Sequence, residues 1–352
     1  MIRKFKINKK LVTLNTAPYI IAEVGHNHQG SIDLCKKIFL EAKKCGASAV
    51  KLQKRNNKKI FSNKIYNKIY NSTNSYGKTY GQHREKLEFG LKEYKILKNY
   101  CKKIKIDFFA TAFDLDSLHF LKKVGCHAIK IASGDCNNLE LIEEAAKTKL
   151  PLIISTGGST FNDVKLAYKT ASKYHKNFVI MQCTSGYPPR FENLNIKVIE
   201  TYQKNFRDIL IGYSGHENGV SIPIACFALG ARVIEKHFTI DRTLKGTDQA
   251  LSLSSNGMRR LTRDLNRASL SLGDGIKRTY EVEKLPLTKM TKIFLAKKSL
   301  KKNHVIKKND LILKIDGNLS GFKQNQISQV IGKKLRKNVK KEEAILKNNL
   351  KK

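Results

Sequence analysis

The sequence lacks the features that would place this protein in a membrane or outside the cell. No apolar stretch approaches the ~20 residues that a membrane-spanning helix needs. The N-terminal stretch MIRKFKINKKLVTLN is charged and has no apolar core of a signal peptide. The seven cysteines are odd in number and form no CxxC pair, which argues against a disulfide framework and a zinc ribbon. We therefore expect a cytoplasmic protein with reduced, mostly buried thiols.

Acidic residues and arginine are also scarce. The 352 residues include 29 acidic and 68 basic side chains, a net charge of +39, and only 13 of the basic residues are Arg. Nucleic-acid-binding proteins usually interleave Arg with aromatic residues in basic patches. Here the Lys are scattered among Asn and Ile, and no helix-turn-helix or zinc-finger spacing occurs. We interpret them as solvated surface residues that attract anionic substrates rather than nucleic acid.

What the sequence contains is a regular alternation of apolar runs with helix-length amphipathic stretches such as SIDLCKKIFLEAKKCG. Strand–helix alternation predicts a parallel sheet, and eight such units predict a (β/α)8 barrel. The length suits this large domain and one smaller domain. The eight predicted strands are YIIAEVG (19–25), AVKLQK (49–54), DFFATAF (107–113), AIKIAS (128–133), PLIISTG (151–157), FVIMQCTS (178–185), ILIGYSGH (209–216) and RVIEKHF (232–238).

Polar residues stand near the C-terminal end of every predicted strand, and pairs within one strand are two residues apart. Such pairs share a face of the strand, and barrel enzymes build their sites at this mouth. A barrel without an active site would not need charged residues at its mouth. The residues are Glu23, Lys51, Gln53, Thr111, Lys130, Ser155, Gln182, Thr184, Ser214, His216, Glu235 and His237.

Part of this set suits an anionic ligand. Lys51 and Lys130 supply point charges for a phosphate or carboxylate group. Ser133, Ser155 and the small residues of the STGG loop (155–158) precede a predicted helix, whose backbone N–H groups can bind an anion. The sequence therefore predicts an anion site at the barrel mouth.

Two histidines end neighbouring predicted strands. Imidazoles at His216 and His237 could share a metal ion, with open positions for water or substrate. The residues alone are equally compatible with two hydrogen-bonded histidines and no metal.

Two segments interrupt the regular pattern. Residues 55–91 form a polar insertion rich in Tyr and Asn, and a long loop after a barrel strand often covers the substrate. After residue 284 the composition changes. We expect a barrel over 1–284, a linker over 285–292 and a small β-rich domain over 293–352, whose apolar pattern includes Val305, Leu311, Leu313 and Ile331.

Several ordered motifs resemble those of the sialic acid synthase family, across about residues 17–350. They are IIAEVGHNHQG, AVKLQK, IKIASGD, PLIISTGG, QCTSGYP, IGYSGHENG and ARVIEKHFTIDRTLKGTDQALSL. The resemblance implies the condensation of phosphoenolpyruvate with an N-acetylhexosamine, usually N-acetylmannosamine. It also implies a divalent metal ion, Mn²⁺ or Mg²⁺, and a nine-carbon sialic acid and phosphate as products.

The resemblance also implies roles for single residues. Glu23 is the expected general base, and Glu235 would support His237 from the same face of its strand. His216 and His237 would hold the metal. Positions that hold phosphoenolpyruvate in the family match Lys51, Thr111, Lys130, Ser133, Ser155 and Ser214. Positions that face the sugar match Gln53, Asp135, Tyr187 and Asp248.

The C-terminal segment resembles the antifreeze-like (SAF) domain of this family. In the family this domain covers the barrel mouth of the partner in a homodimer, so we expect a domain-swapped homodimer. Many bacterial members have an Arg that holds the N-acetyl group where this chain has Ile315. The sugar contacts must therefore differ here.

Three alternatives stay open. The substrate could be N-acetylmannosamine 6-phosphate, because YGKTYGQHREKLEF resembles the 9-phosphate-forming enzymes of animals. It could also be a precursor of legionaminate or pseudaminate. From a different class, the chain could be a non-catalytic barrel that binds polyanions.

Overall fold

The computed structural model describes residues 3–351 and divides the chain into two compact units, Met1–Gly273 and Asp274–Lys352. Within the described residues, no helix has the length and apolar character that crossing a membrane requires.

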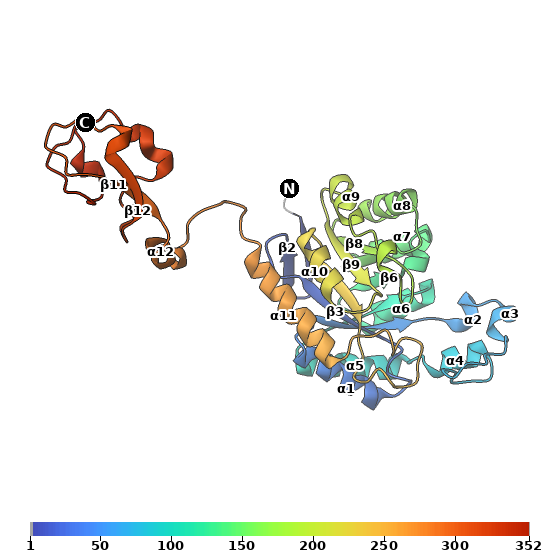
Figure 1. The fold of residues 1–352 in the computed structure, drawn as a ribbon. Coiled ribbons are helices and arrows are strands. Elements are labelled where there is room, and N and C mark those ends of the chain that lie inside the picture. Colours follow the sequence, from blue (N-terminus) through green and yellow to red (C-terminus); the bar gives the residue numbers. More distant parts are fainter. Residues whose placement is uncertain (1–2, 352) are drawn as a thin grey trace. The chain divides into compact units, whose positions relative to one another are not determined.

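The first unit is a closed barrel of eight parallel strands in the order β10-β3-β4-β5-β6-β7-β8-β9 (Figure 1). This confirms the (β/α)8 barrel predicted from the alternation. Each strand lies within one of the eight predicted runs, and nearly every strand residue is buried because both faces of a parallel sheet are covered. The strands are β3 (Tyr19–Gly25), β4 (Ala49–Lys54), β5 (Asp107–Ala112), β6 (Ile129–Ile131), β7 (Leu152–Ser155), β8 (Phe178–Cys183), β9 (Leu210–Gly215) and β10 (Val233–His237).

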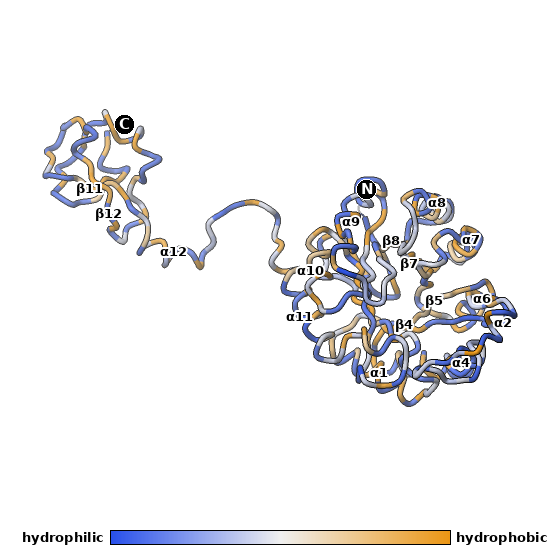
Figure 2. Tube along the Cα trace, turned by 45° about the vertical axis from the view of Figure 1, so that its right-hand side comes forward, coloured by the Kyte–Doolittle hydropathy of each residue, from blue (hydrophilic) through white to orange (hydrophobic). Residues whose placement is uncertain are grey.

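Helices surround the barrel and bury one apolar face against it. Helix α1 shows why: Cys35, Ile38, Phe39 and Ala42 recur at helical spacing and are buried, while the Lys residues between them are not. Figure 2 shows hydrophobic and hydrophilic residues interleaved along these helices. The surrounding helices are α1 (Ile32–Lys44), α5 (Leu91–Ile104), α6 (Leu115–Val124), α7 (Leu139–Lys147), α8 (Phe161–Ser172), α9 (Val198–Asn205), α10 (Ser221–Ala228) and α11 (Ser255–Ser271).

The insertion at 55–91 is not a structureless loop. It contains three short helices, α2 (Asn57–Ile60), α3 (Asn63–Tyr66) and α4 (Tyr80–Lys86). Helix α4 begins at a capping box, in which the Thr79 hydroxyl accepts from the Gln82 backbone N–H and the Gln82 side chain accepts from the Thr79 backbone N–H. This cap fixes the start of a helix that carries cavity residues.

A second unpredicted feature precedes the barrel. Strands β1 (Lys4–Ile7) and β2 (Lys10–Thr13) form an antiparallel hairpin. Phe5, Ile7 and Val12 are buried in the main core of the first unit.

The second unit contains helix α12 (Glu281–Thr288) and an antiparallel pair, β11 (Lys292–Ala296) and β12 (Leu311–Ile315). The expected linker therefore overlaps the end of α12 and the first residue of β11. The core of this unit includes Ile306 and Val330, whereas Val305 and Ile331 are 40% and 38% exposed. Val305 and Ile306 are neighbours in extended backbone and point to opposite faces, so a shift of one position exchanges a core residue for a surface residue. Val330 and Ile331 lie in the turn that follows the 3₁₀ helix η4 (Gln324–Gln329).

Candidate active site

The mouth of the barrel encloses a cavity of about 590 Å³ within the first unit. Its volume lies in the range of small-molecule sites. The structure places every residue of the predicted site in its lining except Asp135, Gln182 and Thr184. The predicted residues that line it are Glu23, Lys51, Gln53, Thr111, Lys130, Ser133, Ser155, Tyr187, Ser214, His216, His237 and Asp248, with Glu235 beside them.

Strand register brings these side chains together. His237 of β10 lies opposite Glu23 of β3, and Glu235 lies opposite Ser214 of β9. Gly25, at the end of β3, has a φ of +52°, and a Cβ there would approach Glu23, Gln53 and Asp248 to within 3.4 Å. A glycine suits this backbone and leaves room for the three side chains to converge.

Glu23, Lys51 and Glu235 form a buried charged group. Lys51 Nζ lies 2.5 Å from Glu23 Oε2 and 3.8 Å from Glu235 Oε1, and it donates to Thr111 Oγ1 at 2.8 Å. Burial opposes ionisation of Glu235, but Lys51 and Lys130 outweigh it and hold the pKa of Glu235 below its usual range. Lys51 thus lies between the two carboxylates, within 4.0 Å of each.

Lys130 is the other buried ammonium. It donates to Ser155 Oγ at 2.6 Å and to the Ile131 carbonyl at 2.8 Å. Within residues 3–351 no carboxylate lies within 4.0 Å of this ammonium, and burial lowers the pKa of Lys130. The floor of the cavity therefore presents a cation whose counter-charge a ligand can supply.

The loop after β7 packs closely on Ser133. The Gly157 backbone N–H donates to Ser133 Oγ at 3.0 Å, and a Cβ at Gly157 would stand 2.9 Å from that oxygen. Only glycine permits this approach. The STGG loop and Ser133 thus form one wall of the predicted anion site.

The two predicted metal ligands lie together. The His216 and His237 ring centroids are 5.2 Å apart, and His237 Nδ1 is buried without a hydrogen-bond partner. Burial, followed by the neighbouring His237, lowers the pKa of His216 to about 3, so that imidazole is neutral and able to bind a metal. Within the described residues no cluster of three or more His, Cys, Asp or Glu has metal-binding geometry. Two imidazoles with an unpartnered nitrogen fit an open divalent site completed by water or substrate.

Three predicted residues lie outside the cavity lining. Asp135 belongs to the 3₁₀ turn η1 (Ser133–Asp135) and hydrogen-bonds with Asn138. Gln182 donates to the Leu194 carbonyl, and Thr184 donates to the Asn193 carbonyl.

Other cavity residues were not predicted. The insertion contributes Arg55, Tyr70, Tyr80, His83 and Arg84. Phe113 and Ser185, at the ends of two predicted strands, and Thr247, in the loop after β10, also line the cavity. The motif YGKTYGQHREKLEF contains Tyr80, His83 and Arg84 and was the signal that pointed toward these three.

Comparison with known proteins identifies the family of this chain. The NeuB family model matches residues 38–277. The chain is 36% identical over 328 residues to human N-acetylneuraminate-9-phosphate synthase, covering 93% of this chain and 91% of that protein. It is 34% identical over 330 residues to the N,N'-diacetyllegionaminic acid synthase of Campylobacter jejuni, covering 93% and 98%.

A solved structure agrees with these matches. The N-acetylneuraminic acid (sialic acid) synthetase of Leptospira borgpetersenii serovar Hardjo-bovis, in complex with citrate, superposes with a TM-score of 0.72 at 31% identity. The match covers 82% of this chain and 96% of that chain. The family resemblance is confirmed, and the chain belongs to the NeuB family of phosphoenolpyruvate-dependent sugar acid synthases.

Proposed function

We propose that this protein condenses phosphoenolpyruvate with N-acetylmannosamine 6-phosphate to give N-acetylneuraminate 9-phosphate and phosphate. The observation that carries the proposal is one cavity with two buried lysines, two buried carboxylates and two imidazoles, in a chain 36% identical to the human 9-phosphate synthase. The unphosphorylated sugar, which the sequence first favoured, is the second candidate, supported by the likeness to the Leptospira synthetase.

The anionic substrate binds at the floor of the cavity. Lys130, with Ser155 and Ser133, takes the phosphate of phosphoenolpyruvate, because it is the buried ammonium without a carboxylate partner. Lys51, Thr111 and Ser214 complete this subsite. Gln53, Tyr187 and Asp248 face the sugar.

Condensation forms a bond between carbon 3 of phosphoenolpyruvate and the aldehyde carbon of the open-chain sugar, which leaves an alkoxide at the former aldehyde oxygen. Water then adds at carbon 2, and one of its protons passes through the Glu23 carboxylate to that alkoxide. The resulting hydroxyl at carbon 2 gives its proton to the departing phosphate as the C–O bond breaks, and the keto acid remains. Lys51 Nζ, 2.5 Å from Glu23 Oε2, orients this carboxylate.

His216 and His237 would hold the divalent metal. When bound, such an ion polarises the aldehyde oxygen as a Lewis acid. Glu235 positions His237 by lying on the same face of β10, and Ser214 donates to Glu235 Oε1 at 3.1 Å.

A sugar panel tests the proposal. The purified protein is incubated with phosphoenolpyruvate and, in turn, N-acetylmannosamine 6-phosphate, N-acetylmannosamine and a diacetamido precursor of legionaminic acid. We expect the highest kcat/KM with the phosphorylated sugar, and a product that mass spectrometry identifies as the 9-phosphate. With phosphoenolpyruvate labelled by ¹⁸O at the bridging oxygen, the label should appear in phosphate. A higher kcat/KM for either unphosphorylated sugar would reject the proposed substrate.

A further inference from the structure

The cavity lining holds two further cations besides Lys51 and Lys130. Arg55, directly after β4, and Arg84, in α4, both line the cavity. Within residues 3–351 neither guanidinium lies within 4.0 Å of a carboxylate oxygen. Glu88 lies nearby, but it accepts from Lys54 Nζ at 3.0 Å and from the Arg55 backbone N–H at 3.3 Å rather than from the guanidinium. Two cations therefore line one cavity without an ion pair of their own, although Glu88 and Asp248 are near enough to favour the charged form of Arg55.

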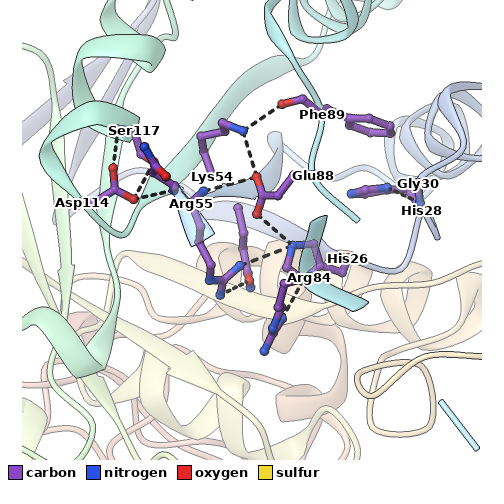
Figure 3. A network of polar contacts seen from close by, with 12 residues as sticks. His26, His28, Gly30, Lys54, Arg55, Arg84, Glu88, Phe89, Asp114 and Ser117 are labelled. Atoms are coloured by element: carbon purple, nitrogen blue, oxygen red, sulfur yellow. Dashed lines mark hydrogen bonds and ion pairs between the residues drawn. The ribbon is translucent and has the colours of Figure 1, made fainter. Parts of the chain in front are cut away.

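One imidazole separates these two cations, as Figure 3 shows. Arg55 Nη1 lies 3.3 Å from His26 Nε2, and Arg84 Nη1 lies 3.3 Å from His26 Nδ1. Burial and the two guanidinium groups hold the pKa of His26 well below its usual range, so the ring is neutral. A neutral imidazole has a single acceptor nitrogen and can accept from only one of the two arginines. The two arginines therefore compete for one imidazole nitrogen, while Glu88 Oε1, 3.8 Å from His26 Nε2, makes no hydrogen bond to either.

The remaining contacts position the guanidiniums without neutralising them. Arg55 lies over the Phe113 ring at 3.7 Å and donates to Gln53 Oε1 at 2.7 Å. Arg84 donates to the Tyr80 hydroxyl through Nε and Nη2 at 3.0 and 2.8 Å. All of these partners are neutral. A guanidinium stacked on a ring keeps its in-plane N–H groups for hydrogen bonds, and this planar fork matches a phosphate group.

Gln53 connects this cluster to the reacting centre. Its Nε2 donates to Glu23 Oε1 at 2.8 Å, while its Oε1 accepts from Arg55. A sugar whose aldehyde lies near Glu23 can thus direct its far end toward the arginines. A buried cation without an ion pair, such as Arg55, is costly, and a dianionic group would supply a counter-charge to it and to the partly buried Arg84.

We propose that Arg55 and Arg84 form the subsite for the phosphate group of the sugar and set the preference for a phosphorylated over an unphosphorylated hexosamine. The inference rests on the proposed function, because it assigns residues to the far end of the proposed substrate. Phosphoenolpyruvate has its own cations at Lys51 and Lys130, so the arginine pair serves the second anion.

Arg84→Met is the main test, because Arg84 is only partly buried and its loss should leave the fold intact. Lys86→Met is the matched control, since it removes the same charge from an exposed position of the same helix. Steady-state rates are measured with N-acetylmannosamine 6-phosphate, N-acetylmannosamine and phosphoenolpyruvate. We expect Arg84→Met to raise the KM for the sugar phosphate roughly 10- to 100-fold, because charged hydrogen bonds to the phosphate are lost. The KM for phosphoenolpyruvate should change less than twofold. Arg84→Lys should recover part of the loss, and Lys86→Met should match the wild type.

A binding measurement covers the case in which a variant loses all turnover. N-acetylmannosamine 6-phosphate alone should raise the melting temperature of the wild type and of Lys86→Met, but not of Arg84→Met or Arg55→Lys. If the wild type prefers the unphosphorylated sugar, the proposed substrate and this subsite both fail. Two results would show that the subsite alone is wrong, provided that the wild type prefers the sugar phosphate. In the first, Arg84→Met has a KM for the sugar phosphate within twofold of the wild-type value. In the second, Arg84→Met lowers kcat/KM equally for the phosphorylated and the unphosphorylated sugar.

Discussion

Lys130 shows at the residue scale how burial prepares a side chain for an anionic ligand. It is 2% exposed, and its ammonium donates only to a hydroxyl and a carbonyl, both neutral groups. A buried ammonium without an anionic partner raises the free energy of the unliganded protein, and a phosphate that binds beside it removes this cost. The same reasoning applies to Arg55, which is also buried in the cavity lining.

Replacing Lys130 with Met should therefore weaken the binding of phosphoenolpyruvate and not that of the sugar. The substitution keeps the length of the side chain and removes the charge, so we expect the KM for phosphoenolpyruvate to rise roughly 10- to 100-fold. The KM for the sugar should change far less. Steady-state kinetics with each substrate varied in turn measure both constants. Lys147→Met, at a surface residue that pairs with Glu143 and Glu144, is the control. A variant in which only the KM for the sugar moved would remove Lys130 from the phosphoenolpyruvate subsite.

At the scale of elements, neighbouring strands bring distant residues into contact. Val233 to Lys236 of β10 pair with Gly212 to Gly215 of β9, and His216 follows β9 directly. His216 and His237 therefore meet because their strands are adjacent in the closed barrel. The same adjacency places His237 opposite Glu23 of β3.

This arrangement predicts a dependence on metal. Dialysis against a chelator should abolish turnover, and added Mn²⁺ or Mg²⁺ should restore it. The double variant His216→Ala, His237→Ala should show no recovery in modest excess of metal. Equilibrium dialysis with Mn²⁺, followed by metal analysis, gives a readout that does not depend on activity, and we expect the double variant to retain little metal. Full activity or undiminished Mn²⁺ binding in the double variant would contradict this assignment.

A second prediction at this scale concerns the short 3₁₀ helix η3 (Lys308–Asp310) of the C-terminal unit. Asp310 is 4% exposed and accepts from His304 Nε2 at 2.8 Å and from the Lys307 backbone N–H at 2.9 Å. Burial opposes its ionisation, but these bonds and Lys298 outweigh it and lower the pKa of Asp310 to about 2. The ionised carboxylate therefore stabilises this unit.

Asp310→Asn should destabilise the unit by about 1–3 kcal/mol at pH 7. Because the folded pKa lies below the unfolded value of about 3.9, the stabilisation is complete well above pH 4 and is lost as the pH falls through about 2. Hydrogen exchange of Lys292–Ala296 in the full chain, compared between wild type and variant at pH 7, 4 and 3, measures this. The difference should be largest at pH 7 and shrink at pH 3. An equal difference at all three values would show that the carboxylate charge is not responsible.

At the scale of the whole molecule, the barrel and the C-terminal unit have separate cores. The core of the first unit includes residues of all eight barrel strands, and the second unit has its own core around Phe294, Leu335 and Ile345. Two units with separate cores can fold independently. The resemblance to the antifreeze-like domain therefore stands as a prediction that the second unit covers the barrel of a partner chain, where it would exclude water from the reaction.

Truncation after Lys289 tests this prediction. The shortened chain should keep a folded barrel, seen by circular dichroism, and lose most of its activity. Mixing it with full-length His237→Ala should restore some turnover, because the intact barrel receives its cover from the variant chain. The control mixture contains two truncated chains, one carrying His237→Ala, and should stay inactive. Normal turnover by the truncated chain alone, or an active full-length monomer in sedimentation, would refute the swapped cover.

The sequence by itself determined the barrel and most of the strand-end residues. Strands and amphipathic helices repeat their side-chain directions at different intervals along the chain, and a few residues are enough to recognise either pattern. Thus Glu23, Lys130 and His237 could be assigned to the mouth because a strand position fixes its face. Loop positions carry no such period, so the sequence could not place Asp135 outside the cavity or show that Val305 and Ile331 are exposed.

Only the tertiary structure decided that the arginine pair exists. His26 follows β3, Arg55 follows β4, and Arg84 lies in α4, and no spacing in the chain relates the three. They meet because β3 pairs directly with β4, and because the insertion returns helix α4 to the same mouth. Contacts between elements depend on how the whole core packs, and that information is distributed over many residues rather than held in a local motif.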